Sequence, residues 1–388
     1  MFGLYIHWPF CLSKCIYCDF GSKVITNRQN SNDFQRQYIN NCTKQMQQIA
    51  AKITPNEPIS SIYFGGGTPS LIDAKNIQQI ITTADKLVKL TDNCEITIEA
   101  NPTSCSLQKF QELKNIGINR ISIGVQSFDD KELAFLGRRH SVAEAIQTIE
   151  NAKKVFNKWS IDLIYALPKQ TLSQWIENLK TALQSNPTHL SLYTLIVEPN
   201  TPLGKLVEIG NITPKTDDEI ADFYLATNEF IAKNSKLKQY EVSNYAIDGF
   251  ESRHNLSYWQ SYDYIGIGAG AHGRLRYKNG KRYETHCFFN PNDWSKNIQQ
   301  NGNGFEIEKE LTTQEQIEEI LLMGLRTKFG INFRDIKQRF NIDLMSFLDE
   351  KKLSSFQKKK LLKCSKHNIT LTPKGLMILD SILIKISR

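Results

Sequence analysis

The chain has 388 residues, of which 40% are hydrophobic, and a formal net charge of +8. This length suits a large catalytic domain followed by a smaller one, and the sequence holds no run of eighteen apolar residues that would predict a transmembrane helix. No charged segment precedes an apolar stretch at the N-terminus, so no signal peptide is expected.

Eight cysteines are present, three of them close together and five scattered. This spacing is not that of a disulfide framework and predicts a protein of the reducing cytoplasm. Charges of both signs are dispersed along the chain, except over residues 351–363. We interpret the positive surplus as solvated surface and expect no nucleic-acid partner.

The first twenty residues contain the most informative pattern. Cys11, Cys15 and Cys18 are spaced CxxxCxxC and follow a short apolar run at residues 4–6 that predicts a strand. Soft thiolates select iron–sulfur clusters, zinc or copper(I), and three cysteines leave one iron of a four-iron cluster free to bind a small molecule. Structural zinc is the alternative, with His7 or Cys42 as the fourth ligand, although no second short Cys/His pair follows.

Helical and extended patterns alternate over the next two hundred residues. Five further strands, at 61–64, 94–99, 120–125, 160–165 and 189–197, are separated by helices at 34–53, 77–90, 107–115, around 131, 142–156 and 172–183. Such alternation predicts βαβ units and a parallel sheet. Because the pattern weakens after Pro199, two units short of an eightfold barrel, we predict an open six-stranded (β/α) barrel within the α/β class.

Polar residues recur where these strands end. Glycines follow the 61–64 strand, Glu99 ends the next, Gln126 follows the one after, and Asp162 lies within the fifth. Functional groups in such folds lie at the carboxyl ends of the strands. We therefore expect these side chains to share one cavity with the cysteine loop.

The remaining chain divides into two parts. Residues 200–235 read as a linker and a helix, 238–245 as an added strand, and the glycine-rich 264–273 as a loop that lacks the context of a nucleotide fingerprint. From residue 311, a helix over 312–328 capped by Thr312 or Thr313, shorter helices at 331–340 and 344–349, a strand at 369–372 and a last helix opened by Pro373 predict a small, mainly helical winged-helix-like unit. The expected domains are 1–235, 236–305 and 306–388.

Several long motifs occur in order: YIHWPFCLSKCIYCDF, YFGGGTPS, IEANP, RISIGVQSFDDKELAFLGRRH, DLIYALPKQT, RHNLSYW and YIGIGAGAHG. Together they resemble the radical S-adenosylmethionine (SAM) proteins of the oxygen-independent coproporphyrinogen III oxidase family and its haem-chaperone branch. The resemblance implies that Cys11, Cys15 and Cys18 hold a [4Fe–4S] cluster whose fourth iron is chelated by SAM. It further implies SAM contacts from Tyr5, Tyr17, Gly66, Gly67, Thr68, Glu99, Gln126, Arg138, Asp162 and Ile196.

Three departures from the oxidase pattern favour the chaperone branch. Phe20 stands where the oxidase has a fourth cysteine, only ten residues precede Cys11, and the RHNLSYW segment has no oxidase counterpart of this kind. The resemblance therefore predicts a protein that binds the cluster, SAM and haem and passes haem to an apoprotein, for which the respiratory chain is one source. The alternative is oxidative decarboxylation of coproporphyrinogen III to protoporphyrinogen IX, and whether the chain is an enzyme stays open.

Haem iron takes an axial ligand such as His, Cys, Met or Tyr. His254 is the leading candidate because Tyr258 and Trp259 follow it closely, with His272 and His7 as the others. A histidine hydrogen-bonded in the core is the competing interpretation of His254. A zinc-containing nucleic-acid binder is a third class of function, and transient membrane association is left open.

Overall fold

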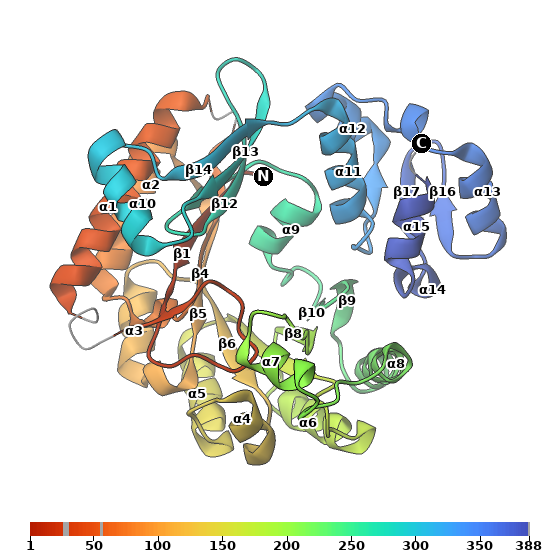
Figure 1. The fold of residues 1–388 in the computed structure, drawn as a ribbon, viewed down its shortest axis with the longest axis horizontal. Helices are drawn as coiled ribbons and strands as arrows, with labels where there is room; N and C mark the ends of the chain where they lie inside the picture. The colour runs from red at the N-terminus through yellow and green to blue at the C-terminus, as the bar shows by residue number, and fades with distance from the viewer. Residues whose placement is uncertain (26–30, 55–56, 387–388) are drawn as a thin grey trace.

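The structure is a computed structural model that describes residues 1–25, 31–54 and 57–386. Within these residues, twelve strands form one curved sheet in the order β14-β13-β12-β11-β1-β4-β5-β6-β7-β8-β10-β9 (Figure 1). Its central strands are parallel, as predicted. They are β1 (Gly3–Trp8), β4 (Ile59–Gly66), β5 (Leu90–Ala100), β6 (Arg120–Gln126), β7 (Lys158–Tyr165) and β8 (His189–Thr194).

Helices alternate with these strands and cover the outer face of the sheet, which confirms the predicted radical SAM-type α/β architecture (Figure 1). Local sequence sets where they begin: Ser141 with Glu144, and Thr171 with Gln174, form capping boxes that satisfy free N–H groups of the first turn. The helices are α1 (Asn32–Lys52), α2 (Ala74–Val88), α3 (Leu107–Asn115), α4 (Asp130–Leu136), α5 (Val142–Val155) and α6 (Leu172–Gln184).

The sheet is wider than predicted. Residues expected as a glycine-rich loop instead form β11 (Tyr264–Ile267), which pairs in parallel with β1. An added Cβ at Gly266 would lie 1.9 Å from the His272 carbonyl oxygen, so glycine here permits a close approach of the next strand. The strand was not predicted because its sequence is rich in glycine.

The structure also supports the rejection of a nucleotide-binding fingerprint. Such a fingerprint requires a helix after the glycines, whereas a strand follows them here.

Antiparallel strands complete both edges. Beyond β11 lie β12 (His272–Arg276), β13 (Arg282–Cys287) and β14 (Phe305–Glu310), with α10 (Pro291–Asn301) between the last two. At the other edge, the strand expected over 238–245 forms the hairpin β9 (Lys238–Glu241) and β10 (Asn244–Ala246), preceded by α7 (Pro202–Glu208) and α8 (Asp217–Asn234). The short helix α9 (Arg253–Trp259) carries the RHNLSYW segment.

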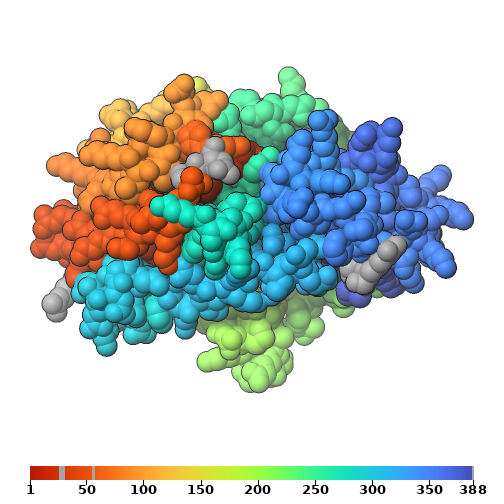
Figure 2. Space-filling model, turned by 90° about the horizontal axis from the view of Figure 1, so that it is seen from above, coloured from red at the N-terminus to blue at the C-terminus, as the bar shows by residue number. Residues whose placement is uncertain are grey.

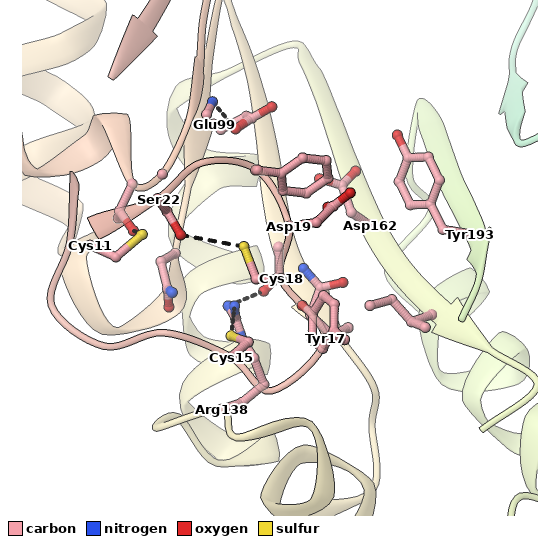
Figure 3. Close-up of a pocket in the computed structure, with 18 of the residues that line it drawn as sticks. Cys11, Cys15, Tyr17, Cys18, Asp19, Ser22, Glu99, Arg138, Asp162 and Tyr193 are labelled. Atoms are coloured by element: carbon pink, nitrogen blue, oxygen red, sulfur yellow. Dashed lines mark hydrogen bonds between the residues drawn. The ribbon is translucent and has the colours of Figure 1, made fainter. Parts of the chain in front are cut away.

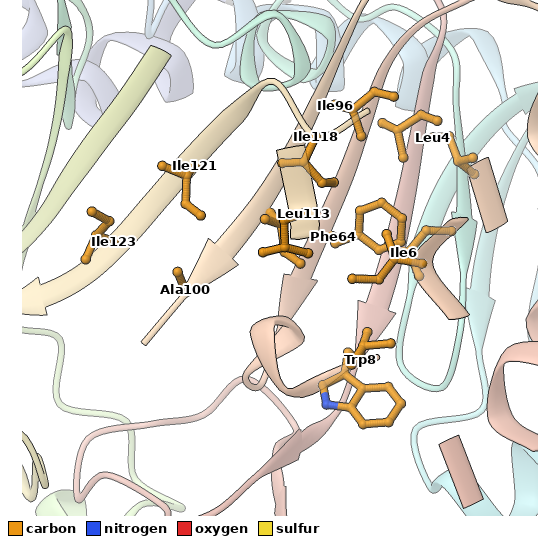
Figure 4. Close-up of a cluster of buried hydrophobic side chains, with 14 of the residues drawn as sticks. Leu4, Ile6, Trp8, Phe64, Ile96, Ala100, Leu113, Ile118, Ile121 and Ile123 are labelled. Carbon is orange, nitrogen blue, oxygen red and sulfur yellow. The ribbon is translucent and has the colours of Figure 1, made fainter. Parts of the chain in front are cut away.

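Alternation along β1 explains how the core and the inner face of the sheet separate. Leu4, Ile6 and Trp8 are buried in the apolar core (Figure 4), where Trp8 packs edge-on against Tyr38 of α1. Successive strand side chains point to opposite faces, so the intervening Tyr5 and His7 face the inside of the barrel. The first strand therefore anchors the cysteine loop with one face and supplies polar aromatic groups with the other.

The C-terminal part has its own small sheet, β15-β17-β16, and its own buried apolar cluster. Figure 2 shows this part in blue at one end of the molecule, with the N-terminal helices at the other. Its elements are α11 (Thr313–Gly324), β15 (Ile331–Asn332), α12 (Phe333–Phe340), α13 (Glu350–Lys358), β16 (Leu362–Cys364), β17 (Asn368–Leu371), α14 (Pro373–Leu376) and α15 (Leu379–Ile386), with a 3₁₀ turn at Leu344–Phe347.

Two predictions about this part are refined. Thr312 caps α11 in a capping box with Glu315, as expected, but the helix ends at Gly324 rather than Lys328. An added Cβ at Gly324 would lie 2.3 Å from Ile331 Cγ1, so β15 packs directly on the end of the helix. Within the described residues, no helix is both long and apolar enough to cross a bilayer.

Candidate functional site

A cavity of about 720 Å³ lies at the carboxyl ends of the parallel strands. The loop that follows β1 closes one side of it, and residues from the ends of β4 to β8 form much of the rest (Figure 3). This is where ligands bind in folds of this class. The wall includes almost all the side chains that the sequence singled out, namely Cys11, Cys15, Tyr17, Cys18, Gly66, Gly67, Thr68, Glu99, Gln126, Arg138, Asp162 and Ile196.

Each of the three loop cysteines contacts a different polar group. Thr68 Oγ1 donates to the Cys11 sulfur, Arg138 Nη1 donates to the Cys15 sulfur, and the Cys18 sulfur shares a hydrogen bond with Ser22, each at 3.4 Å (Figure 3). Burial raises the pKa of the Cys11 thiol, and the Thr68 hydrogen bond partly offsets this. The donors around all three sulfurs suit thiolate ligands.

The same geometry argues against the zinc alternative. In the described part of the chain, no group of three or more His, Cys, Asp or Glu side chains lies close enough to hold a single metal ion. Cys42 is fully buried on α1, and His7 shares a hydrogen bond of 2.9 Å with the Tyr5 hydroxyl. The three loop cysteines line one cavity, and neither His7 nor Cys42, the expected fourth zinc ligands, belongs to its wall.

The glycines at the end of β4 bring backbone against the cysteine loop. Gly66 has a φ of +109°, and an added Cβ would lie 2.6 Å from the His7 ring. At Gly67 an added Cβ would lie 2.6 Å from the Phe10 carbonyl oxygen, and its N–H donates to the Trp8 carbonyl at 2.6 Å. Only glycine permits both the conformation and the approach, so the turn fixes the start of the cysteine loop.

Two buried carboxyl groups face the cavity. Glu99 accepts hydrogen bonds from the Tyr63 hydroxyl at 2.9 Å and from Gly66 N at 3.1 Å. Burial, together with the nearby Asp162, raises the pKa of Glu99 to about 7, although the Tyr63 hydrogen bond partly offsets this. Burial likewise raises the pKa of Asp162 to about 6, against the hydrogen bonds from its neighbouring serines. A cationic ligand would stabilise both carboxylates.

Arg138 and Gln126 occupy the neighbouring wall. Besides contacting Cys15, Arg138 donates to the Gly124 carbonyl at 2.8 Å, and its buried Nε has no partner among the described residues. Gln126 lies at a φ of +70°, where β6 bulges against β7. Backbone strain of this kind is concentrated at binding sites, and an unpaired guanidinium N–H suits a carboxylate ligand.

Two of the expected residues lie elsewhere. Tyr5 lines a second, neighbouring cavity and stacks on Tyr63 and His254. His254 is only 1% exposed, and both its ring nitrogens are occupied: Nδ1 by Ser61 Oγ at 3.0 Å and Nε2 by the Tyr258 hydroxyl at 2.5 Å. Neither nitrogen is free to bind iron in this arrangement, which matches the core-histidine interpretation.

The cavity also contains residues that sequence reasoning did not identify. Tyr193 on β8 faces it from the sixth strand, where strand alternation offered a signal. Arg326 enters from the C-terminal part and lies over the Trp259 ring, 4.9 Å from its centroid. No local pattern marks Arg326, because it lies outside any helix or strand and far along the chain.

Comparison with known proteins agrees with this geometry. The sequence profile of the Radical SAM superfamily matches residues 5–182, and that of the HemN C-terminal domain matches residues 311–378. The solved structure of coproporphyrinogen III oxidase (HemN) from Escherichia coli is similar, with a TM-score of 0.81 at 21% identity, over 99% of this chain and 89% of that one. At this identity the likeness concerns the fold alone.

Sequence relatives are similar over nearly the whole chain. "Heme chaperone HemW" of Buchnera aphidicola subsp. Schizaphis graminum is 35% identical, with 98% of this chain and 97% of that protein covered. "Radical S-adenosyl methionine domain-containing protein 1, mitochondrial" of Danio rerio is 35% identical over 98% of this chain and 86% of that protein. The chain therefore belongs to the radical SAM family that includes the heme chaperone HemW.

Proposed function

We propose that this chain binds a [4Fe–4S] cluster, SAM and haem, and passes haem to an acceptor apoprotein. The observation that carries the proposal is the convergence of three thiols, the buried Glu99 and Asp162 and the Arg138 guanidinium on one cavity, in a chain related over nearly its full length to heme chaperone HemW. Membership of the radical SAM family implies the cluster and SAM. An apoprotein of the respiratory chain is one candidate acceptor.

Cys11, Cys15 and Cys18 would hold the cluster, and the bound cluster would supply an iron with an open coordination position. Arg138 would pair with the carboxylate of SAM, while Glu99 and Asp162 would accept hydrogen bonds from its ammonium or ribose groups. Gly66, Gly67 and Thr68 would contact its amino-acid part, and Gln126 would make a further contact with SAM. Tyr5 and Tyr17 would flank SAM, and the exposed Ile196 would pack against its adenine.

The domain limits expected from sequence remain part of the proposal. Residues 1–235 would hold the cluster and SAM, 236–305 would extend the sheet, and 306–388 would form a separate unit after its first residues complete β14 of the main sheet. Salt bridges from Glu319 to Arg274 at 2.7 Å and to Arg282 at 3.2 Å tie the last two together. Arg326 supports a functional link, because it reaches the main cavity from the C-terminal part.

Anaerobic reconstitution tests the proposal. We expect about four irons per chain, SAM binding that depends on the loop cysteines, a haem complex with a Soret band, and transfer of that haem to an added apo-cytochrome. A reconstituted protein that holds the cluster but takes up no haem would refute the haem-carrier function. Coproporphyrinogen oxidase activity is not favoured, because Phe20 replaces the oxidase cysteine and is 65% exposed.

A further inference from the structure

A second cavity, of about 490 Å³, lies on the other side of Gly66 and Glu99 from the main one. Its size falls in the ~300–1,000 Å³ range of small-molecule sites. Tyr5, His7, Tyr258, Tyr264, His272 and Phe289 give it an aromatic wall, and Asp19 and Phe20 connect it to the cysteine loop. Of the proposed SAM contacts, Tyr5 faces this space alone, whereas Gly66 and Glu99 line both cavities.

The aromatic side chains present flat apolar surface at the cavity and its rim. Tyr258 and Tyr264 pack edge to face, with ring centroids 4.4 Å apart. Phe289 is 59% exposed and Phe20 is 65% exposed, although both are large apolar groups. An added Cβ at Gly21 would lie 2.6 Å from the Phe289 ring, so glycine lets Phe289 approach the cysteine loop closely. Exposed aromatic groups gathered round a cavity suit a planar apolar ligand.

The histidines give the cavity a second chemistry. His272 is exposed at the start of β12, and among the described residues neither of its ring nitrogens has a hydrogen-bond partner. Its ring lies 3.9 Å, centroid to centroid, from that of His286 on β13, its direct cross-strand partner. His7 is 7% exposed and already bonded to Tyr5. Only Nδ1 of His7 has that partner, but its ring is buried, so His272 is the exposed imidazole on this cavity that could reach a metal centre.

His254 has a place in the same arrangement. Its Nε2 is bonded to the Tyr258 hydroxyl, and its ring packs at 4.8 Å against the Tyr258 ring. Tyr258 lines the cavity, whereas His254 does not. His254 thus acts as a positioning residue that holds Tyr258 against the cavity from within the core.

We propose that haem binds in this second cavity, with His272 as an axial ligand of its iron and with Tyr258, Tyr264 and Phe289 against the macrocycle. This inference rests on the proposed function, since haem binding itself is proposed there. It places haem beside the cysteine loop, in a cavity that adjoins the SAM cavity and shares Asp19, Phe20, Gly66 and Glu99 with it, so the two ligands would lie on either side of these residues.

Titration of the purified full-length chain with ferric haem tests the site. We expect His272→Ala to shift the Soret band and to weaken haem binding by at least roughly tenfold. Removing a residue that only supports a metal ligand already weakens metal binding about tenfold, and removing the ligand itself should cost at least as much. Added imidazole should restore the spectrum. Metal-free protoporphyrin IX, which needs no axial ligand, should bind His272→Ala like wild type and bind Phe289→Ala more weakly.

The matched control is His367→Ala, at an exposed histidine of the C-terminal part, which should leave the haem spectrum and affinity unchanged. Melting curves and iron counts should show that every variant is folded and holds its cluster. Wild type that binds no haem refutes the proposed function. If wild type binds haem and His272→Ala has the same haem spectrum, this site is wrong but the proposed function stands. The same holds if the spectral change expected from loss of an axial ligand occurs only in His254→Ala.

Discussion

Glu99 is a buried residue in the wall of the main cavity, and its protonation makes stability depend on pH. Burial raises its pKa from 4.5 to about 7. At about 1.4 kcal/mol per pH unit, this corresponds to roughly 3 kcal/mol. In the unfolded chain the group ionises near pH 4.5, whereas in the folded protein it stays protonated to near pH 7. The contribution of Glu99 is therefore complete below pH 4.5 and is lost as pH rises to about 7.

The measurement is thermal unfolding of the metal-free protein from pH 5 to pH 8. We expect wild type to lose stability over this range and Glu99→Gln to lose about 3 kcal/mol less, since the amide does not ionise. Asp162, whose pKa is about 6, also lowers stability as pH rises, but its loss is complete at a lower pH than that of Glu99. The difference in stability between wild type and Glu99→Gln above pH 6 therefore reports on Glu99. Glu112→Gln, at an exposed glutamate of α3, is the matched control.

Identical pH profiles for wild type and Glu99→Gln would refute this reasoning. Cofactor loading gives a second check. If SAM places positive charge near the two carboxyl groups, the reconstituted protein with SAM should show a flatter fall in stability than the metal-free protein. A steeper fall on loading would mean that SAM leaves these carboxyl groups without a cationic partner.

Three further predictions follow from the cavity wall. Replacing all three loop cysteines with Ser should abolish iron and sulfide uptake, whereas Cys364→Ser, on β16 far along the chain, should not; full iron in the triple variant would disprove the cluster site. Gly66→Ala should lower the free energy of unfolding by at least ~1–3 kcal/mol, because the φ of Gly66 is +109° and the new Cβ would lie 2.6 Å from His7. Gly210→Ala is the control, because Gly210 has a φ of +75° but no atom within 4 Å, so this variant should show backbone strain only. Equal melting temperatures for the two variants would contradict this prediction. The reconstituted protein should form no protoporphyrinogen IX from coproporphyrinogen III, with E. coli HemN as the positive control, and turnover by this chain would move it to the oxidase branch.

The sequence was sufficient to predict six of the parallel strands and the polar residues at their carboxyl ends. Apolar runs bounded by turn residues mark buried strands, and carboxyl ends of parallel strands meet at one edge, so Glu99 and Asp162 could be placed beside the cysteine loop before any coordinates. β11 was not predicted, because Gly266 interrupts the apolar pattern that marks a strand. The fold requires glycine there, since a side chain would collide with the neighbouring strand β12.

The surroundings of two expected site residues could not be predicted. Tyr5 was expected near SAM from the family resemblance and His254 near haem from its sequence neighbours, yet the contacts of both depend on partners brought by other elements. Ser61 on β4 occupies one nitrogen of His254, and Gly66 and Glu99 stand between Tyr5 and the main cavity. Such contacts join residues far apart in the chain, so the local spacing of apolar and polar residues does not predict them.

The position of β1 inside the sheet also bears on when the protein becomes able to hold iron. β1 precedes the other described strands in the chain, but it is bonded on one side by β4 and on the other by β11, which begins at residue 264. Until β11 has been synthesised, the strand that anchors the cysteine loop has one open edge. We therefore expect metal loading to follow translation, and a nascent chain that ends before residue 264 to lack a held cluster despite containing every cysteine that would bind it.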